Sequence, residues 1–346
     1  MGTDLKRFDK TWHDVLLENF AVIHYVFFFI IAPPLSIFLA FFMLFSSYWS
    51  RESSVVSSFR HFVLLYGIWV YLTWDSPRYG LRRSRWYQSC SLWKYFAAYF
   101  PIDLVKTADL DTSRNYIIGI HPHGVMGIGA FTTLCTNATG FWEMFPGITP
   151  YLATLPGQFL FPFRREYISL TGAVSCEKDV LQSLLEGQKG KAVGIILGGA
   201  EESLECRPNS FNLILNKRKG FIKLAFETGS CLVPCFNFGE NSTYDQMSNE
   251  RGSFLRRLQH IILQTFGFGA PVIVGCGIFN CPFGILPFRT PIHTVVGEPI
   301  EVALTPEPTV EQIEELHVRY CSELKRLFNE HKGKYGIGAD VELNLL

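Results

Sequence analysis

The segment from Ala21 to Tyr48 is apolar almost throughout, and its main interruptions are His24 and the pair Pro33-Pro34. As a helix, such a segment is long enough to cross about 30 Å of hydrocarbon. Proline removes a backbone hydrogen bond and crowds the preceding turn, so the pair predicts a bend. The sequence therefore predicts a kinked transmembrane helix near the amino terminus.

A second apolar stretch runs from Val55 to Trp74, with Arg60 and His61 near its start. Both polar side chains are able to reach the headgroup region while the apolar residues stay in lipid. Two interpretations remain open, a second span or a re-entrant leg. We therefore expect residues 21–75 to form a membrane hairpin with one or two spans.

Basic residues flank this hairpin on both sides. They are Lys6, Arg7 and Lys10 before it, and Arg78, Arg82, Arg83 and Arg85 after it. Positive charge accumulates on the cytoplasmic side of membrane segments. We therefore predict that residues 1–20 and the chain beyond the hairpin both face the cytosol.

The composition favours lipid partners over polyanionic ones. The formal net charge is zero, while 48% of the residues are hydrophobic and 15% are aromatic. A neutral chain has no electrostatic attraction for nucleic acid, and the apolar surplus fits contact with lipid. Nucleic acid is therefore excluded as a partner, and a membrane is expected.

After the basic cluster, strand-like and helix-like segments alternate, which is typical of an α/β layer fold. Helices are predicted at residues 178–186, ended by Gly187, and after Thr309, which forms a capping box with Gln312. One domain from 86 to 346 accommodates these elements. The predicted strands are 116–120, 192–197, 231–238, 271–274 and 293–296.

The tetrapeptide His121-Pro122-His123-Gly124 directly follows the first of these strands. Ligands of open α/β sheets collect beyond the carboxyl ends of strands, and imidazole transfers protons near neutral pH. The alternative is that the histidines only satisfy backbone groups in a turn. For an isolated histidine the turn interpretation would be the favoured one, and it is the second motif, described next, that shifts the balance toward a functional site.

A second polar cluster follows the strand at 192–197. It reads Gly198-Gly199-Ala200-Glu201-Glu202-Ser203, so it is expected at the same edge of the sheet as the histidines. Small residues let a substrate approach the backbone, whose N–H groups stabilise an oxyanion, and a carboxylate orients a histidine. Alone, this sequence is equally compatible with an ordinary turn; together, the two clusters predict a catalytic site.

The segment from Lys217 to Lys223 concentrates positive charge before a short helix that ends at Gly229. Basic side chains at a helix start favour phosphate. A solvated loop, or one that faces anionic headgroups, is the alternative. A phosphate-bearing ligand is one prediction for this segment.

The sequence lacks the motifs of several common hydrolases and nucleotide-binding proteins. The chain lacks Gly-x-Ser-x-Gly, a Walker A sequence and a Gly-x-Gly-x-x-Gly after a strand. No third ligand is spaced to complete a metal site with His121 and His123, so we expect neither a metal nor a cofactor.

The motifs together resemble the type-2 acyl-CoA:diacylglycerol acyltransferase family, which also contains monoacylglycerol and wax-alcohol acyltransferases. The resemblance spans nearly the whole chain. Its carriers are Tyr99-Phe100-Pro101, His121-Pro122-His123-Gly124, Gly198-Gly199-Ala200 with Glu202, Arg218-Lys219-Gly220-Phe221 through Leu232-Val233-Pro234 to Phe238-Gly239-Glu240, and Pro291-Ile292 with Val295 to Ile300.

The resemblance implies a glycerolipid-acyltransferase-like α/β domain behind a membrane hairpin in the endoplasmic reticulum, and a lipid droplet is a further location. It implies acyl-CoA as donor substrate, a lipid alcohol as acceptor and, as an open question, a homo-oligomer. The predicted catalytic residues are His123 as general base, His121 as its partner, and Glu202, which orients or charge-stabilises the imidazole.

The predicted substrate-binding residues follow from the same resemblance. Gly198 and Gly199 are expected to hold the oxyanion, Gly124 to line the site, and Arg218, Lys219 and Lys223 to bind the phosphates of CoA. Diacylglycerol is the expected acceptor, with 2-monoacylglycerol and wax alcohols as alternatives. A non-enzymatic lipid-droplet anchor is the interpretation from a different class.

Overall fold

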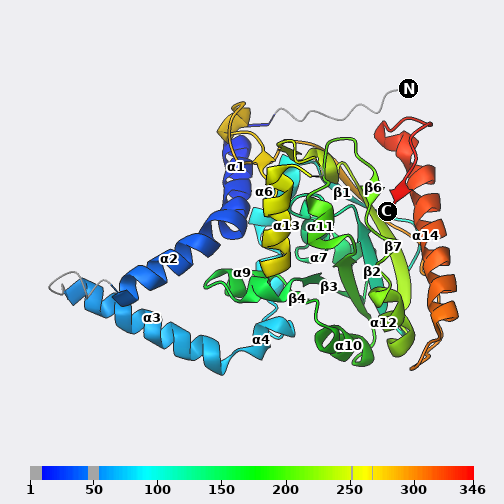
Figure 1. Cartoon of the computed structure of the whole chain (residues 1–346), viewed down its shortest axis with the longest axis horizontal. Coiled ribbons are helices and arrows are strands. Elements are labelled where there is room, and N and C mark those ends of the chain that lie inside the picture. Colours follow the sequence, from blue (N-terminus) through cyan, green and yellow to red (C-terminus); the bar gives the residue numbers. More distant parts are fainter. Residues whose placement is uncertain (1–9, 46–53, 251, 267) are drawn as a thin grey trace.

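The computed structural model describes residues 10–45, 54–250, 252–266 and 268–346. Lys6, Arg7 and the end of the first apolar stretch, from residue 46 through Tyr48, lie outside these residues. Figure 1 shows a layered α/β body from which a long helical arm extends. The α/β class predicted from the alternating segments is confirmed.

A seven-stranded sheet forms the centre of the body. Strands β7, β2, β5, β3 and β4 are parallel to one another, whereas β10 pairs antiparallel with β7 and parallel with β1. In spatial order the strands are β1 (Ile102–Lys106), β10 (Ile292–Val296), β7 (Cys231–Phe238), β2 (Tyr116–His121), β5 (Lys191–Ile196), β3 (Thr149–Thr154) and β4 (Ala173–Ser175).

Four of the predicted strands lie in this sheet within one or two residues of their predicted bounds. The fifth prediction, 271–274, is confirmed only over its last two residues, which form β9 (Ile273–Val274). This strand pairs with β8 (Asp245–Gln246) in a ribbon separate from the central sheet. Strands β1, β3 and β4 were not predicted from the sequence. β3 contains Pro150 and β4 has three residues, so neither carries a clear strand signal.

Helices cover both faces of the sheet, and the alternation of side chains along β2 divides the core in two. Ile118 and Ile120 belong to the cluster that contains Trp93 of α6 (Ser91–Tyr99) and residues of α7 (Ile128–Leu134). Ile117 faces the cluster that contains Tyr320 of α14. This second layer consists of α10 (Lys178–Glu186), α12 (Gly220–Thr228) and α14 (Val310–Lys332).

The local end signals are confirmed for three helices. Gly187 is the C-cap of α10, Gly229 ends α12 in the left-handed conformation at φ 62°, and Thr309 forms the capping box of α14 with Gln312. The other α-helices of the body are α4 (Asp75–Arg78), α5 (Arg85–Gln88), α8 (Phe141–Met144), α9 (Arg164–Leu170), α11 (Gly199–Ser203) and α13 (Phe254–Phe266). The short strands β6 (Asn212–Leu213) and β11 (Asn344–Leu345) pair with each other.

Helix α1 (Trp12–Val26) packs on the body and leads through a π-helical turn (Phe27–Ile31) into the arm. The arm consists of α2 (Ala32–Phe45) and α3 (Ser54–Leu72), which contact each other. The helix bends between α1 and α2 (Figure 1), next to the prolines that lack a backbone donor. Among the described residues, Trp12–Phe45 is the one helix long and apolar enough to cross a membrane.

The two halves of this long helix have different surroundings. Ala21, Val22, Tyr25 and Val26 on α1 are buried in the core of the body. The side chains of α2 are largely exposed and apolar, including Phe38, Phe41, Phe42 and Phe45. The core of the body therefore includes residues from the start of the first apolar stretch, whereas α2 leaves its apolar side chains exposed.

Candidate active site

His121 is the last residue of β2 and is fully buried. Its Nε2 lies 3.1 Å from the hydroxyl of Tyr320, and that hydroxyl donates its single proton to the carbonyl of Gly119. The ring Nε2–H of His121 is therefore the donor toward Tyr320. Burial lowers the pKa of His121 to about 3, so the imidazole is neutral at physiological pH. These surroundings are those of a structural histidine, and a direct part in catalysis stays a prediction.

His123 differs from His121 because it is partly exposed. Its Nδ1 lies 3.0 Å from the carbonyl oxygen of Gly124, which only accepts hydrogen bonds. The ring proton therefore sits on Nδ1, and Nε2 keeps its lone pair. Burial lowers the pKa of His123 below its ordinary value, against the bond to Gly124, which raises it. A neutral imidazole with a free Nε2 is chemically suited to accept a proton.

Glu202 joins the two predicted clusters. Its Oε1 accepts the main-chain N–H of His123 at 2.7 Å, and its Oε2 accepts the main-chain N–H of Ile214 at 2.7 Å. Burial raises the pKa of Glu202 to about 7, although both N–H donors and the charge of Arg218 favour the ionised form. The expected proximity of the histidine motif and this carboxylate is present.

The contact differs from the expected one in its partner atom. We expected Glu202 to orient the imidazole itself, but the carboxylate holds the main chain of His123, and the ring nitrogen Nδ1 is held by Gly124. The main-chain N–H of His123, just beyond the end of β2, points toward Glu202 on α11. The carboxylate therefore binds this N–H and not the imidazole ring. Glu202 is therefore a positioning residue in this structure.

Glu240 is a site residue that the sequence analysis did not select. Its carboxylate is fully buried and accepts the N–H groups of Ile128 and Gly129, at 2.8 and 2.7 Å, at the start of α7. Burial raises the pKa of Glu240 to about 7. Gly124 has φ +64°, and a Cβ on it would lie 2.6 Å from the Glu240 side chain. The motif Phe238-Gly239-Glu240 can be read in the sequence, but the contact between Glu240 and Gly124 is seen only in the structure.

The first of the paired glycines, Gly198, lies directly against Glu202. A Cβ on Gly198 would lie 2.1 Å from Glu202 Oε2, so only glycine leaves room for the carboxylate, and Gly199 has φ +63°. The close approach explains why residue 198 is a glycine, and the left-handed backbone explains why residue 199 is one. Their predicted role in holding an oxyanion stays a prediction.

The three predicted CoA-binding cations do not gather in one place. Arg218 Nη2 lies 3.3 Å from the carbonyl of Gly198 and 3.2 Å from Glu201 Oε2, so it reaches the glycine pair. Lys219 pairs with Glu314 of α14, and Lys223 with Glu227 of its own helix. The geometry brings Arg218 to the site and directs Lys219 and Lys223 to other partners.

A cavity of about 810 Å³ lies beside Arg218, with four cationic side chains and two carboxylates in its wall. Two of the cations come from α13. The sequence did not connect this helix with the site, because it begins about 30 residues beyond the predicted basic segment. The residues that line it are Glu201, Glu205, Ile214, Lys217, Arg218, Gly252, Arg256, Arg257, His260, Ile261 and Leu346. We call it the basic cavity.

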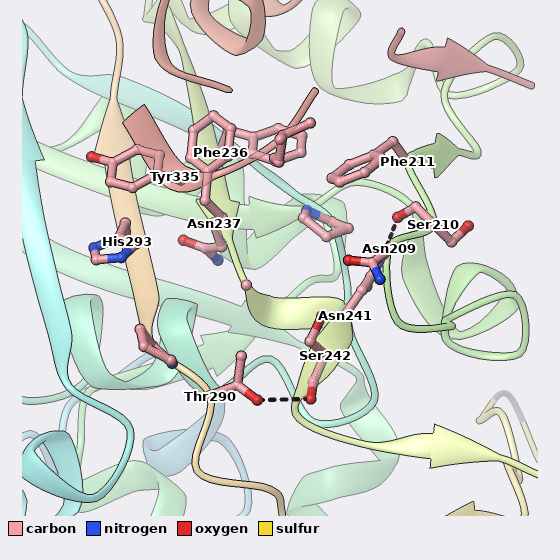
Figure 2. Close-up of a pocket in the computed structure, with 15 residues that line it drawn as sticks. Asn209, Ser210, Phe211, Phe236, Asn237, Asn241, Ser242, Thr290, His293 and Tyr335 are labelled. Carbon is pink, nitrogen blue, oxygen red and sulfur yellow. Dashed lines mark hydrogen bonds between the residues drawn. The ribbon is translucent and has the colours of Figure 1, made fainter. Parts of the chain in front are cut away.

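A second cavity, of about 250 Å³, lies at the carboxyl end of β7. Figure 2 shows its amide and hydroxyl side chains, which include Asn237, Asn241, Ser242 and Thr290. As the described residues define it, no Lys, Arg, Asp or Glu lines this space. We call it the neutral cavity.

The structure combines a mostly parallel sheet, a histidine beyond a strand end and an adjacent pair of glycines, an arrangement compatible with an enzyme that transfers a group to a hydroxyl. The chain belongs to the diacylglycerol acyltransferase family, whose model matches residues 54–346. It is therefore an acyltransferase, as the motifs predicted. This membership sets aside the interpretation as a non-enzymatic lipid anchor.

Three relatives illustrate the breadth of this family. The chain is 46% identical to 2-acylglycerol O-acyltransferase 1 of Bos taurus, over 93% of each chain. It is 45% identical to diacylglycerol O-acyltransferase 2 of Danio rerio, over 79% of this chain and 76% of the relative. It is 41% identical to acyl-CoA wax alcohol acyltransferase 1 of Homo sapiens, over 82% and 86%.

Among solved structures, the 1-acyl-sn-glycerophosphate (LPA) acyltransferase PlsC of Thermotoga maritima is similar with a TM-score of 0.41. The two sequences are 16% identical, and the match covers 92% of this chain and 96% of that one.

Proposed function

We propose that the protein transfers a fatty acyl group from acyl-CoA to the hydroxyl of an acylglycerol, with His123 as general base. The observation that carries this proposal is the bond between His123 Nδ1 and Gly124 O, because it leaves Nε2 free to take a proton. The lowered pKa of His123 supports it, since the imidazole is then neutral at the pH of the cytosol.

In the proposed reaction, Nε2 of His123 removes the proton of the acceptor hydroxyl while its oxygen attacks the thioester carbonyl carbon. The new C–O bond forms, the C–S bond breaks, and the imidazolium returns its proton to the leaving thiolate of CoA. No acyl-enzyme is needed. Main-chain N–H groups of Gly198 and Gly199 are proposed to stabilise the oxyanion, and Glu202 keeps the backbone of His123 in place.

The basic cavity is the proposed binding site for the phosphates of CoA. It is lined by Arg218, which contacts the glycine pair, and by Lys217 and Arg257, while Arg256 is already paired with Glu205. Guanidinium and ammonium groups bind phosphate through charge-assisted hydrogen bonds. Glu201 also lines this cavity and is adjacent to Glu202 in the chain, so a donor held there would lie next to the proposed base.

The acceptor is proposed to be diacylglycerol or 2-monoacylglycerol. The relatives named for 2-acylglycerol are 42–51% identical to this chain, and those named diacylglycerol O-acyltransferase 2 in Danio rerio and Bos taurus are 45% and 44% identical. These ranges overlap and support both acceptors. A wax alcohol ranks third, on a relative that is 41% identical.

We further propose that the enzyme resides in the endoplasmic reticulum membrane as a multi-pass protein with both termini in the cytosol, and that it also reaches lipid droplets. The apolar helix Trp12–Phe45 and the exposed phenylalanines of α2 support membrane association. A domain at the membrane surface would receive its lipid acceptor directly from the bilayer.

The test is an acyl-transfer assay in purified membranes with labelled acyl-CoA and, in parallel, diacylglycerol, 2-monoacylglycerol and hexadecanol. His123→Ala is expected to reduce turnover by about 10²- to 10⁴-fold, the usual contribution of a general base. His13→Ala, which changes an exposed histidine on α1, is the matched control. Turnover within twofold of wild type in His123→Ala, at equal protein abundance, would exclude His123 as the base.

A further inference from the structure

The sequence from 265 to 288 contains no Asp, Glu, Lys or Arg, and the second half of this segment folds back on itself. Cys276 and Leu286 exchange both of their main-chain hydrogen bonds, at 2.7 and 2.9 Å. Closer to the tip, the N–H of Gly277 donates to the carbonyl of Cys281. We call residues 275–286 the apolar loop.

The tip of the apolar loop exposes large apolar side chains. Residues 278–285 are all exposed, and Phe283 is 85% exposed, so its ring adds little to the core. A contiguous exposed apolar patch marks a surface that a membrane or another molecule covers. The large apolar side chains of the tip are Ile278, Phe279, Phe283 and Ile285.

The apolar loop lies against α1, the helix that leads into the arm (Figure 1). The N–H of Phe279 donates to Asn19 Oδ1 at 3.2 Å, and the rings of Phe279 and Trp12 meet edge-on with centroids 6.4 Å apart. The exposed side of α1 carries Trp12, Leu16 and Phe20. The exposed apolar surface therefore continues from the loop along α1 toward the exposed phenylalanines of α2.

The base of the apolar loop is tied to the chain that follows the histidine motif. The hydroxyl of Tyr244 donates to Ile285 O at 2.9 Å and lies 3.4 Å from Met126 Sδ. The hydroxyl of Tyr25 on α1 donates to Met126 O at 3.1 Å. Met126 follows closely after His123 in the chain, so the apolar loop and α1 both adjoin the proposed catalytic centre.

We propose that the apolar loop inserts into the membrane interface beside α1, as a lipid contact separate from the arm. This inference rests on the membrane location proposed above and adds the face of the body that lies on the bilayer. A bilayer is the occupant that fits, because the same exposed surface continues into α2. A protein interface normally has a polar rim, whereas the loop carries no charged side chain. In this orientation a lipid acceptor reaches His123 from the side of the membrane.

The test uses the full-length protein in phosphatidylcholine vesicles, with the photoreactive residue p-benzoylphenylalanine at one position at a time. It replaces Phe283 on the apolar loop, Phe41 on α2 as the membrane reference, and Val318, which is 60% exposed on α14, as the control. On irradiation, position 283 is expected to form lipid adducts with at least about fivefold the yield of position 318, and within about threefold of position 41, because an inserted loop contacts acyl chains.

The three positions separate the inference from the proposed membrane location. A yield at 283 equal to that at 318, with adducts at 41, overturns the inference and leaves the membrane anchor standing. A cross-link from 283 to a second protein chain in place of lipid also overturns it. Absence of adducts at 41 contradicts the membrane location, and the inference with it. If the variant at 283 does not accumulate, Ile278, 50% exposed on the same loop, is replaced with the same expectations.

Discussion

Glu202 accepts the main-chain N–H of His123 at 2.7 Å and that of Ile214 at 2.7 Å, so one buried carboxylate fixes the backbone on both sides of the site. This contact ties the end of β2 to the loop before α12. Glu202 acts by positioning His123, because Glu202 holds the main chain of His123 while the carbonyl of Gly124 holds the imidazole.

Glu202→Gln should therefore impair turnover through position. A glutamine of the same shape accepts only one of the two N–H groups and turns its own N–H toward the other, which costs about 1–3 kcal/mol of the free energy of unfolding. We expect at least a tenfold loss of kcat with a smaller change in KM for acyl-CoA, measured together with thermal unfolding. Gly198→Ala, which displaces the same carboxylate, should act in the same direction. Near-normal stability and kcat in both variants would contradict this role.

Gly124→Ala tests the contact with Glu240. The new Cβ would lie 2.6 Å from the Glu240 side chain, in addition to the cost of a left-handed residue at φ +64°. Gly336→Ala is the matched control, because Gly336 has φ +75° and no atom within 4 Å of the added Cβ. We expect Gly124→Ala to lose about 1–3 kcal/mol more of the free energy of unfolding than the control, measured by denaturant titration. Equal losses would show that the contact is unimportant.

The buried carboxyl of Glu240 predicts a pH dependence of stability. Its pKa is about 7 in the folded protein against an ordinary 4.5, so above pH 4.5 the unfolded chain releases a proton that the folded one keeps. The stability of wild type relative to Glu240→Gln should therefore decrease as pH rises from 4.5 to 7, by about 3 kcal/mol in total, and stay constant above. Comparison with the variant cancels the titration of other groups. A difference that is constant or grows with pH would contradict the raised pKa.

The basic cavity predicts which cations bind acyl-CoA. Lys217→Gln and Arg257→Gln should each raise the KM for acyl-CoA about 3- to 10-fold, since one partly screened charge contact contributes about 1 kcal/mol, and added salt should reduce the difference. Lys223→Gln distinguishes the sequence prediction from the structure, because Lys223 pairs with Glu227. Lys325→Gln on the exposed side of α14 is the control. A larger effect from Lys223→Gln than from Arg257→Gln would favour the sequence prediction.

The local elements of this protein were readable because their signals are short-range. A glycine that ends a helix, as Gly229 does, or a threonine that caps one, as Thr309 does, acts on residues within one turn. Strand β7 was predicted within its bounds, and the family followed from motifs that are contiguous in the chain. The same applies to the bend before the proline pair of α2, whose cause lies within the helix.

Only the tertiary structure decided which atoms meet. Sequence reasoning placed Glu202 near His123 but assigned it to the imidazole, because spacing along a chain does not show whether a carboxylate meets a ring or an amide. It also missed the basic side chains of α13, the burial of α1 in the core and the contact between the apolar loop and α1, which depend on residues distant in the sequence. The chain determines its helices and strands through neighbouring residues, whereas the site arises where packing brings separate strand ends and helices together.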